Sequence, residues 1–177
     1  MQTFTTVAEY LYLLCEISKM MDFLGSKAMF YLAAAVSDFY IPDDKLSQHK
    51  IQSKSSSTLE LSLEPVPKIL GSLVQEWARR GYVISFKLET DQTLLIPKSR
   101  AALESYGHQI VVGNILETRK SIVWMVEKDS ISIIELSAVH NEQILEIEEL
   151  IVTQLVEKHN LWITSNPNSN TQKTNLK

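Results

Sequence analysis

The stretch that decides the fold reads YLAAAVSDFYIPDDKLSQHKIQS over residues 31–53. An unbroken run of apolar and small residues from Met29 to Val36 predicts a strand covered on both faces, as in a parallel sheet flanked by helices. The run ends at Ser37 and Asp38, and open α/β sheets bind ligands beyond the carboxyl ends of their strands. Spacing alone favours the simpler alternative, a buried strand that leads into a solvated loop.

A lysine further along this stretch suggests chemistry on phosphate. Lys50 lies in a segment too rich in Ser, Gln and Asp to be core. We interpret it as a residue of a lid that faces the end of the strand. Its ammonium is a compact charge that can neutralise a leaving pyrophosphate. No Ser–His pair and no activated cysteine is evident, so we expect a reaction that proceeds by positioning and charge stabilisation.

Composition is ordinary for a soluble globular protein. The chain has 177 residues, of which 45% are hydrophobic and 21% charged, and its formal net charge is −4. This length allows one domain with its own core. The absence of a basic stripe predicts no nucleic-acid partner. Without a stretch of ~20 apolar residues or a signal peptide, we expect a cytoplasmic protein without a membrane partner. Cys15 is expected to be an inert buried thiol, and the scattered histidines predict no metal site.

Helix and strand patterns alternate along most of the chain. Thr6 and Glu9 have the spacing of a capping box, and the apolar periodicity that follows predicts a helix over 6–22. The sequence then predicts strands over 58–63, 82–88 and 110–113, a helix opened by Pro65 and Pro67 and closed by Gly81, and a helix over 94–106. Such alternation favours a doubly wound parallel sheet.

The pattern changes beyond Arg119. Residues 121–126 and 131–136 predict an antiparallel hairpin, and 142–159 predict a long amphipathic helix. We therefore expect one α/β domain over 1–163, with a Rossmann-like, doubly wound, mostly parallel sheet and a small antiparallel hairpin near the C-terminus. A disordered polar tail over 164–177 is expected to follow.

Three of the predicted strands carry polar side chains at or just after their carboxyl ends. These ends hold Asp38, the group formed by Phe86, Lys87 and Glu89, and Asn114. Because the carboxyl ends of parallel strands meet at one edge of a sheet, we expect these residues to converge on a ligand-binding crevice. Each also has a structural explanation: turn caps for the Asp and the Asn, a core position for the Phe, and a surface ion pair for the Lys and Glu.

Five motifs carry a family resemblance. They are AAAVSDFY at 33–40, HKIQS at 49–53, PVPKIL at 65–70, SFKLETD at 85–91 and VVGNILETR at 111–119. Their order and spacing resemble the eukaryotic phosphopantothenate–cysteine ligases (phosphopantothenoylcysteine synthetases) of coenzyme A biosynthesis. The resemblance covers about residues 5–159. It implies a homodimer that uses ATP, or CTP in the bacterial branch, with Mg²⁺ to join 4′-phosphopantothenate and cysteine through an acyl-nucleotide intermediate.

The resemblance also implies roles for particular residues. Ala34, Ala35 and Asp38 would line the phosphopantothenate site. Phe86 and Asn114 would contact the nucleotide, and we assign Lys87 and Glu89 to the same nucleotide site. Lys50 matches the lid lysine, which we expect to be catalytic because it stabilises negative charge during acyl-nucleotide formation.

The chain also departs from the family pattern. The family carries an N-terminal segment with a glycine-rich phosphate turn, and nothing in this sequence corresponds to it. Gly113 stands where the family commonly has alanine. An alternative is therefore a catalytically incomplete isoform that dimerises with a full-length ligase through the segments after Arg119. A weaker alternative is a generic α/β nucleotide-binding domain with another substrate.

Overall fold

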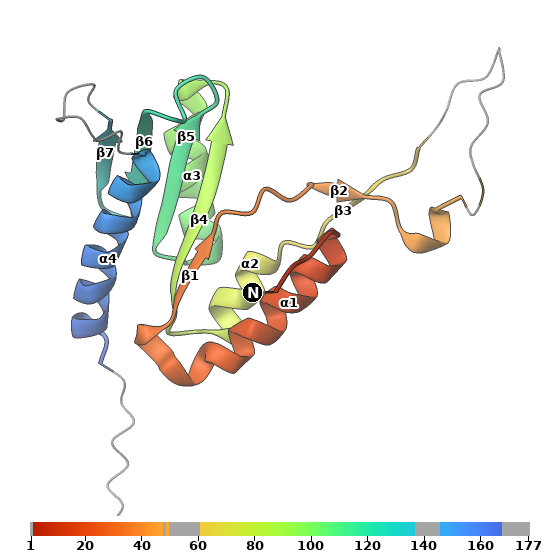
Figure 1. Cartoon of the computed structure of the whole chain (residues 1–177), viewed down its shortest axis with the longest axis horizontal. Coiled ribbons are helices and arrows are strands. Elements are labelled where there is room, and N and C mark those ends of the chain that lie inside the picture. Colours follow the sequence, from red (N-terminus) through yellow and green to blue (C-terminus); the bar gives the residue numbers. More distant parts are fainter. Residues whose placement is uncertain (1, 48, 50–60, 137–145, 168–177) are drawn as a thin grey trace, which may run out of the picture.

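A mixed five-stranded sheet forms the centre of the molecule (Figure 1). The computed structural model describes residues 2–47, 49, 61–136 and 146–167. The strand order is β1-β4-β5-β6-β7, with β1 (Met29–Leu32), β4 (Tyr82–Glu89), β5 (Ile110–Ile115), β6 (Ile122–Val126) and β7 (Ile131–Glu135). β1, β4 and β5 are parallel, whereas β6 and β7 form an antiparallel hairpin beside β5. The predicted fold class is confirmed.

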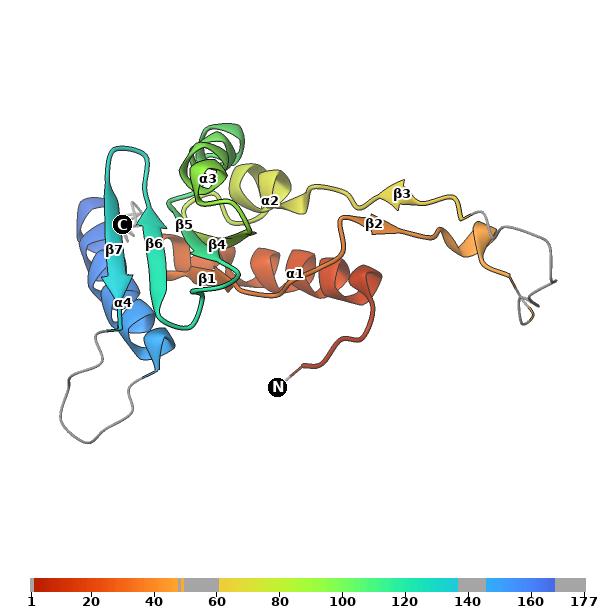
Figure 2. The same cartoon turned by 90° about the horizontal axis from the view of Figure 1, so that it is seen from above.

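Helices cover both faces of this sheet (Figure 2). α4 (Ile147–Ser165) packs on one face through Ile147, Ile151 and Leu155. α3 (Gln92–Tyr106) and α2 (Ile69–Ser72), which continues into a π-helical turn at Leu73–Trp77, lie on the other face. α1 (Val7–Met21) packs on that turn. No helix among the described residues is long and apolar enough to cross a membrane.

Local signals explain where α1 and α3 begin and end. Glu9 N donates to Thr6 Oγ1 and Thr6 N donates to Glu9 Oε2, both at 3.2 Å, so the predicted capping box is present. Asp91 caps α3 by accepting from Thr93 N at 2.8 Å. Gly107 ends α3 at φ 74°, a left-handed conformation that favours glycine.

The first predicted strand is shorter than expected. β1 ends at Leu32, and Ala33–Asp38 form an exposed connection without regular structure. β1 is an edge strand, and its pairing with β4 stops at Leu32↔Ser85. Small apolar residues that leave such an edge find no neighbouring strand, so the apolar run did not imply burial on both faces.

Two further boundaries differ from the sequence prediction. Residues 58–60 lie outside the described residues, and 61–63 form no strand. The strand in this part of the chain is instead β3 (Glu64–Pro65), which pairs with β2 (Phe39–Tyr40) in a two-stranded arm. Figure 1 shows this arm extending away from the sheet. α4 continues to Ser165, past the expected end at His159, while residues 142–145 and most of the expected tail lie outside the described part of the chain.

Candidate functional site

The carboxyl ends of β4 and β5 lie side by side and carry the polar groups that the sequence singled out. Lys87 is in register with Gly113, Leu88 with Asn114 and Glu89 with Ile115. Leu116 N donates to Glu89 O at 2.9 Å, which extends the pairing past the end of β5. β5 therefore runs two residues further than predicted, and Asn114 belongs to the strand itself.

Glu89 is the centre of an ion-pair cluster at this edge. Lys98 Nζ, from α3, lies 2.8 Å from Glu89 Oε2, and Lys87 Nζ lies 3.4 Å from Glu89 Oε1. The hydrogen bond from Lys98 is the largest of the effects that lower the pKa of the Glu89 carboxyl below its ordinary value. The Glu89 side chain is 10% exposed, whereas the two lysines are 40% and 46% exposed. Two ammonium groups on one carboxylate leave one net positive charge, which suits binding of a phosphate oxygen.

Phe86 and Asn114 face the other side of the sheet. Successive side chains of a strand point to opposite faces, so Phe86 lies on the α4 side and Lys87 and Glu89 on the α3 side. The Phe86 ring meets the ring of Tyr31 edge-to-face, with centroids 4.9 Å apart. Asn114 shares this face with Val112 of the α4 core and is half-buried. A half-buried aromatic ring near an amide can hold a planar heterocycle by stacking and hydrogen bonding.

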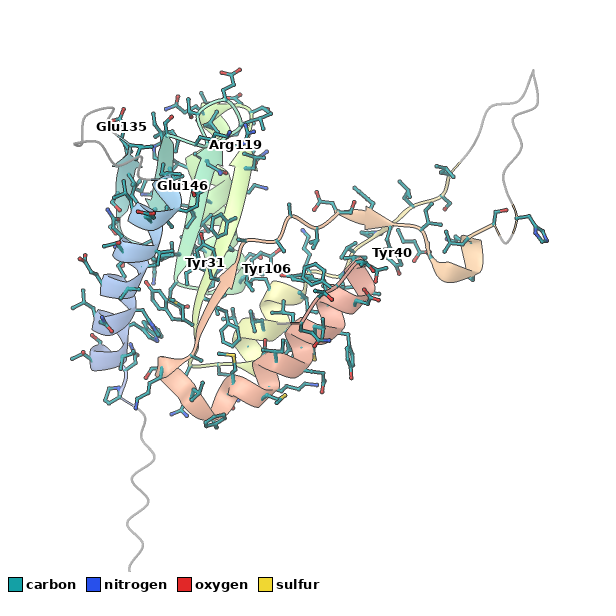
Figure 3. The ribbon with its side chains drawn as sticks, viewed as in Figure 1. Tyr31, Tyr40, Tyr106, Arg119, Glu135 and Glu146 are labelled. Atoms are coloured by element: carbon teal, nitrogen blue, oxygen red, sulfur yellow. The ribbon has the colours of Figure 1, made fainter. Side chains whose placement is uncertain are left out.

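The four residues assigned to the nucleotide therefore fall into two pairs on opposite faces. A ligand that touches both pairs must cross the carboxyl edge of the sheet between β4 and β5. Figure 3 shows Arg119 near this edge and Tyr31 on β1. The Arg119 guanidinium donates to Leu116 O, which ties the connection after β5 to the strand end.

The residues assigned to phosphopantothenate lie in the connection that leads from β1 to the arm. Ala34, Ala35 and Asp38 are all exposed. Asp38 precedes β2, and its backbone oxygen accepts from Val66 N at 2.9 Å. The structure thus brings together the ends of β4 and β5 and places Asp38 at the base of the arm. Lys50 lies outside the described residues.

Lys98 was missed in the sequence. Lys98 lies on α3, nine residues after Glu89. Because α3 starts beside the carboxyl end of β4, residues in its first turns lie close to Glu89. The predicted strand–helix order contained this signal, but a lone lysine on a helix has no distinctive pattern. Among the described residues, no group of three His, Cys, Asp or Glu side chains could hold a metal ion.

Fold and edge together define a Rossmann-like α/β domain with a polar site at the carboxyl ends of its strands. Residues 16–159 match the family described as DNA/pantothenate metabolism flavoprotein C-terminal domain, and the chain belongs to this family. It is 50% identical over 160 residues to the human phosphopantothenate–cysteine ligase, covering 90% of this chain and 51% of that protein. It is 38% identical over 180 residues to the phosphopantothenate–cysteine ligase CAB2 of Saccharomyces cerevisiae, covering 90% of this chain and 48% of that protein.

Solved structures agree with the fold. A Cab2 mutant in complex with phosphopantothenate-cysteine matches with a TM-score of 0.83 and 40% identity, over 92% of this chain and 53% of that chain. A DNA/pantothenate metabolism flavoprotein from Streptococcus pneumoniae matches with a TM-score of 0.67, over 91% of this chain and 72% of that chain. At 18% identity this match supports the fold alone. The chain spans about half the length of the curated relatives that it matches.

Proposed function

We propose that this chain provides one wall of the active site of an ATP-dependent phosphopantothenate–cysteine ligase. The observation that carries the proposal is the match to the Cab2 structure, whose bound molecule is the condensation product of the two proposed substrates. The 50% identity to the human ligase over 90% of this chain adds to it. We also propose a cytoplasmic location, which suits such a biosynthetic enzyme.

The proposed reaction has two steps. A carboxylate oxygen of 4′-phosphopantothenate attacks the α-phosphorus of the nucleotide, and the bond to pyrophosphate breaks. The cysteine amine then attacks the acyl carbon, nucleoside monophosphate leaves, and the amine proton passes to solvent. Negative charge builds on phosphate oxygens in the first step, so a nearby ammonium lowers its barrier. Lys50 is proposed for this catalytic role.

Residues at the strand ends are proposed to hold the nucleotide. The Phe86 ring would stack on the base and Asn114 would hydrogen-bond beside it, while Lys87 and Glu89 would lie at the phosphates across the edge. Mg²⁺ would be held chiefly by phosphate oxygens, because both Glu89 oxygens already contact lysines. Ala34, Ala35 and Asp38 would line the phosphopantothenate site, where small side chains allow close approach of a ligand to the backbone.

The other wall of the site is proposed to come from the part of a full-length ligase that this chain does not match. A homodimer is proposed on the family resemblance. The alternative is an interaction subunit that pairs with a full-length ligase.

Pyrophosphate release tests the proposal. The 177-residue chain is given 4′-phosphopantothenate, MgATP and cysteine, alone and mixed with the human ligase, and each substrate is omitted in turn as a control. Release by the chain alone that needs 4′-phosphopantothenate and MgATP for the first turnover, and cysteine for continued turnover, supports the enzyme. Altered release in the mixture alone supports the interaction subunit. No effect in either case contradicts both an enzyme that is active alone and the interaction subunit.

A further inference from the structure

The outer side of α1 carries a row of exposed side chains. In Figures 1 and 2, α2 lies on one side of α1, and none of the described helices or strands lies on the other. The inner side of α1 holds Ser18, which is buried, and Met21, which packs against the core cluster around Leu73. We call the exposed row on the outer side the α1 stripe; its members are Tyr12, Glu16, Lys19 and Phe23.

The α1 stripe has the spacing of a helix–helix contact. Its successive members are four, three and four residues apart, which keeps one line of side chains facing a partner helix. Asp22 still has helical dihedral angles, φ −57° and ψ −30°, so the chain remains helical as far as Phe23. The two ends of the stripe, Tyr12 and Phe23, are 67% and 77% exposed. Aromatic side chains are enriched at protein interfaces, so this face is a candidate contact surface.

The α1 stripe is complementary to a second copy of itself. A two-fold axis at the middle of the stripe places Tyr12 beside the partner's Phe23 and Glu16 beside the partner's Lys19. Two-fold symmetry repeats both contacts. In a parallel pair of helices, Glu16 would face the partner's Glu16 and Lys19 the partner's Lys19, and like charges oppose such a pair. The charges of the stripe therefore favour an antiparallel second copy.

The two charged residues at the centre remain available to a partner. Lys19 Nζ lies 3.4 Å from Glu16 Oε1 in the same helix, and the two side chains are 53% and 48% exposed. An exposed pair of this kind contributes little to stability by itself. In the antiparallel pair the four charges alternate in sign around the two-fold axis, so each gains an opposite charge across the interface. The aromatic contacts on both sides keep water from this centre, which strengthens the attraction.

We propose that the α1 stripe binds a second copy of this chain in an antiparallel helix pair. The contact is small, so the dissociation constant should be on the order of 100 µM. The argument rests on α1 alone. It depends neither on the proposed ligase activity nor on the homodimer that the family resemblance implies.

Sedimentation equilibrium of the 177-residue chain, from about 10 µM to 1 mM, tests this pairing. Glu16→Lys and Lys19→Glu each place like charges across the interface, and each should weaken association at least about tenfold. An equimolar mixture of the two variants should associate about as well as the unaltered chain, because the lysines of one variant then face the glutamates of the other. A role for the two charges within a single helix predicts no such recovery, since mixing changes nothing inside a chain.

Control variants separate this contact from general charge effects. Lys120→Glu and Glu157→Lys reverse exposed charges elsewhere and should leave association unchanged, alone and mixed. Phe23→Ser removes one aromatic end and should weaken association about tenfold. Because the altered side chains are exposed, circular dichroism should show the same helix content in every variant.

Three results would overturn the proposal. The first is an unaltered chain that does not associate up to 1 mM, including one that instead sediments with phosphatidylcholine vesicles. The second is an association that neither Glu16→Lys nor Lys19→Glu weakens, which would place the contact elsewhere. The third is a mixture of these two variants that associates no better than either alone.

Discussion

Lys98 Nζ lies 2.8 Å from Glu89 Oε2, and Lys87 Nζ lies 3.4 Å from the other oxygen of the same carboxylate. This contact joins α3 to the end of β4 at the edge where the candidate site lies. It keeps Glu89 ionised and leaves one lysine charge in excess. Lys98 therefore shares with Lys87 the Glu89 carboxylate that would otherwise contact Lys87 alone.

The Lys98–Glu89 contact makes stability depend on pH. The pKa of Glu89 is lowered in the folded protein, so this stabilisation is present above the ordinary carboxyl pKa of about 4 and is lost as pH falls through the lower folded value. Lys98→Met should raise the pKa of Glu89 and weaken that dependence. Carboxyl ¹³C NMR of Glu89 measures the pKa. Lys120→Met, at an exposed position, is the control, and an unchanged Glu89 titration in Lys98→Met would contradict the ion pair.

His108 should make the protein less stable in mild acid. Its pKa is about 4 in the fold and ordinarily about 6.5, so the unfolded chain binds more protons between these values. Stability should rise with pH across this window, with up to about 3 kcal/mol lost on acidification. Urea unfolding at several pH values measures it. His108→Gln removes the titration and should flatten the profile between pH 4 and 6.5; an equally steep profile in that variant would show that other groups are responsible.

Gly81 and Gly71 should respond oppositely to alanine. A Cβ at Gly81 would lie 2.8 Å from the Phe30 ring and 3.2 Å from Ala78 O, so Gly81→Ala should destabilise the protein by about 1–3 kcal/mol. The nearest atom to a Cβ at Gly71 is Tyr106 Cδ1 at 3.7 Å, and Gly71 is helical, so Gly71→Ala should be neutral or stabilising. The urea concentration at the midpoint of unfolding measures the stability of each variant. An equal effect of the two substitutions would contradict the predicted packing.

Lys50→Ala should reduce ligase turnover without unfolding the protein. The expectation comes from the family resemblance, because Lys50 lies outside the described residues. Loss of a group that stabilises developing charge costs about a hundredfold or more in turnover. Lys45→Ala is the matched control, since Lys45 makes a surface ion pair with Glu64 at 2.7 Å and should change turnover little. Unchanged turnover in Lys50→Ala would remove Lys50 from the mechanism. The assay measures formation of phosphopantothenoylcysteine by a hybrid of the human ligase that carries residues 1–177.

Sequence patterns predicted the central part of the fold closely because its signals are local. The Thr6–Glu9 capping box and the strand over 82–88 reappear within a residue or two of where they were expected. The end of β1 could not be predicted in this way. Burial of Ala33–Val36 depends on a neighbouring strand, and a sequence pattern does not reveal whether one is present.

The candidate site was predicted as a set of residues but not as an arrangement. The pairing of Leu88 with Asn114 follows from adjacent parallel strands, as the alternation pattern indicated. Side chains alternate between the two faces along a strand, which separates Phe86 from Lys87 and Glu89. Proximity along the chain alone groups the three residues and does not show this separation. Lys98 joins them through tertiary structure alone.

The proposed function requires that residues 1–177 can serve as half of a phosphopantothenate–cysteine ligase. The most direct test replaces the matching half of the human ligase with residues 1–177 and measures formation of phosphopantothenoylcysteine from 4′-phosphopantothenate, ATP and cysteine. A folded hybrid should form product at a rate within about tenfold of the parent, and Lys50→Ala should lower that rate by about a hundredfold or more. A hybrid that folds and binds its substrates but forms no product would show that this chain cannot supply its half of the ligase.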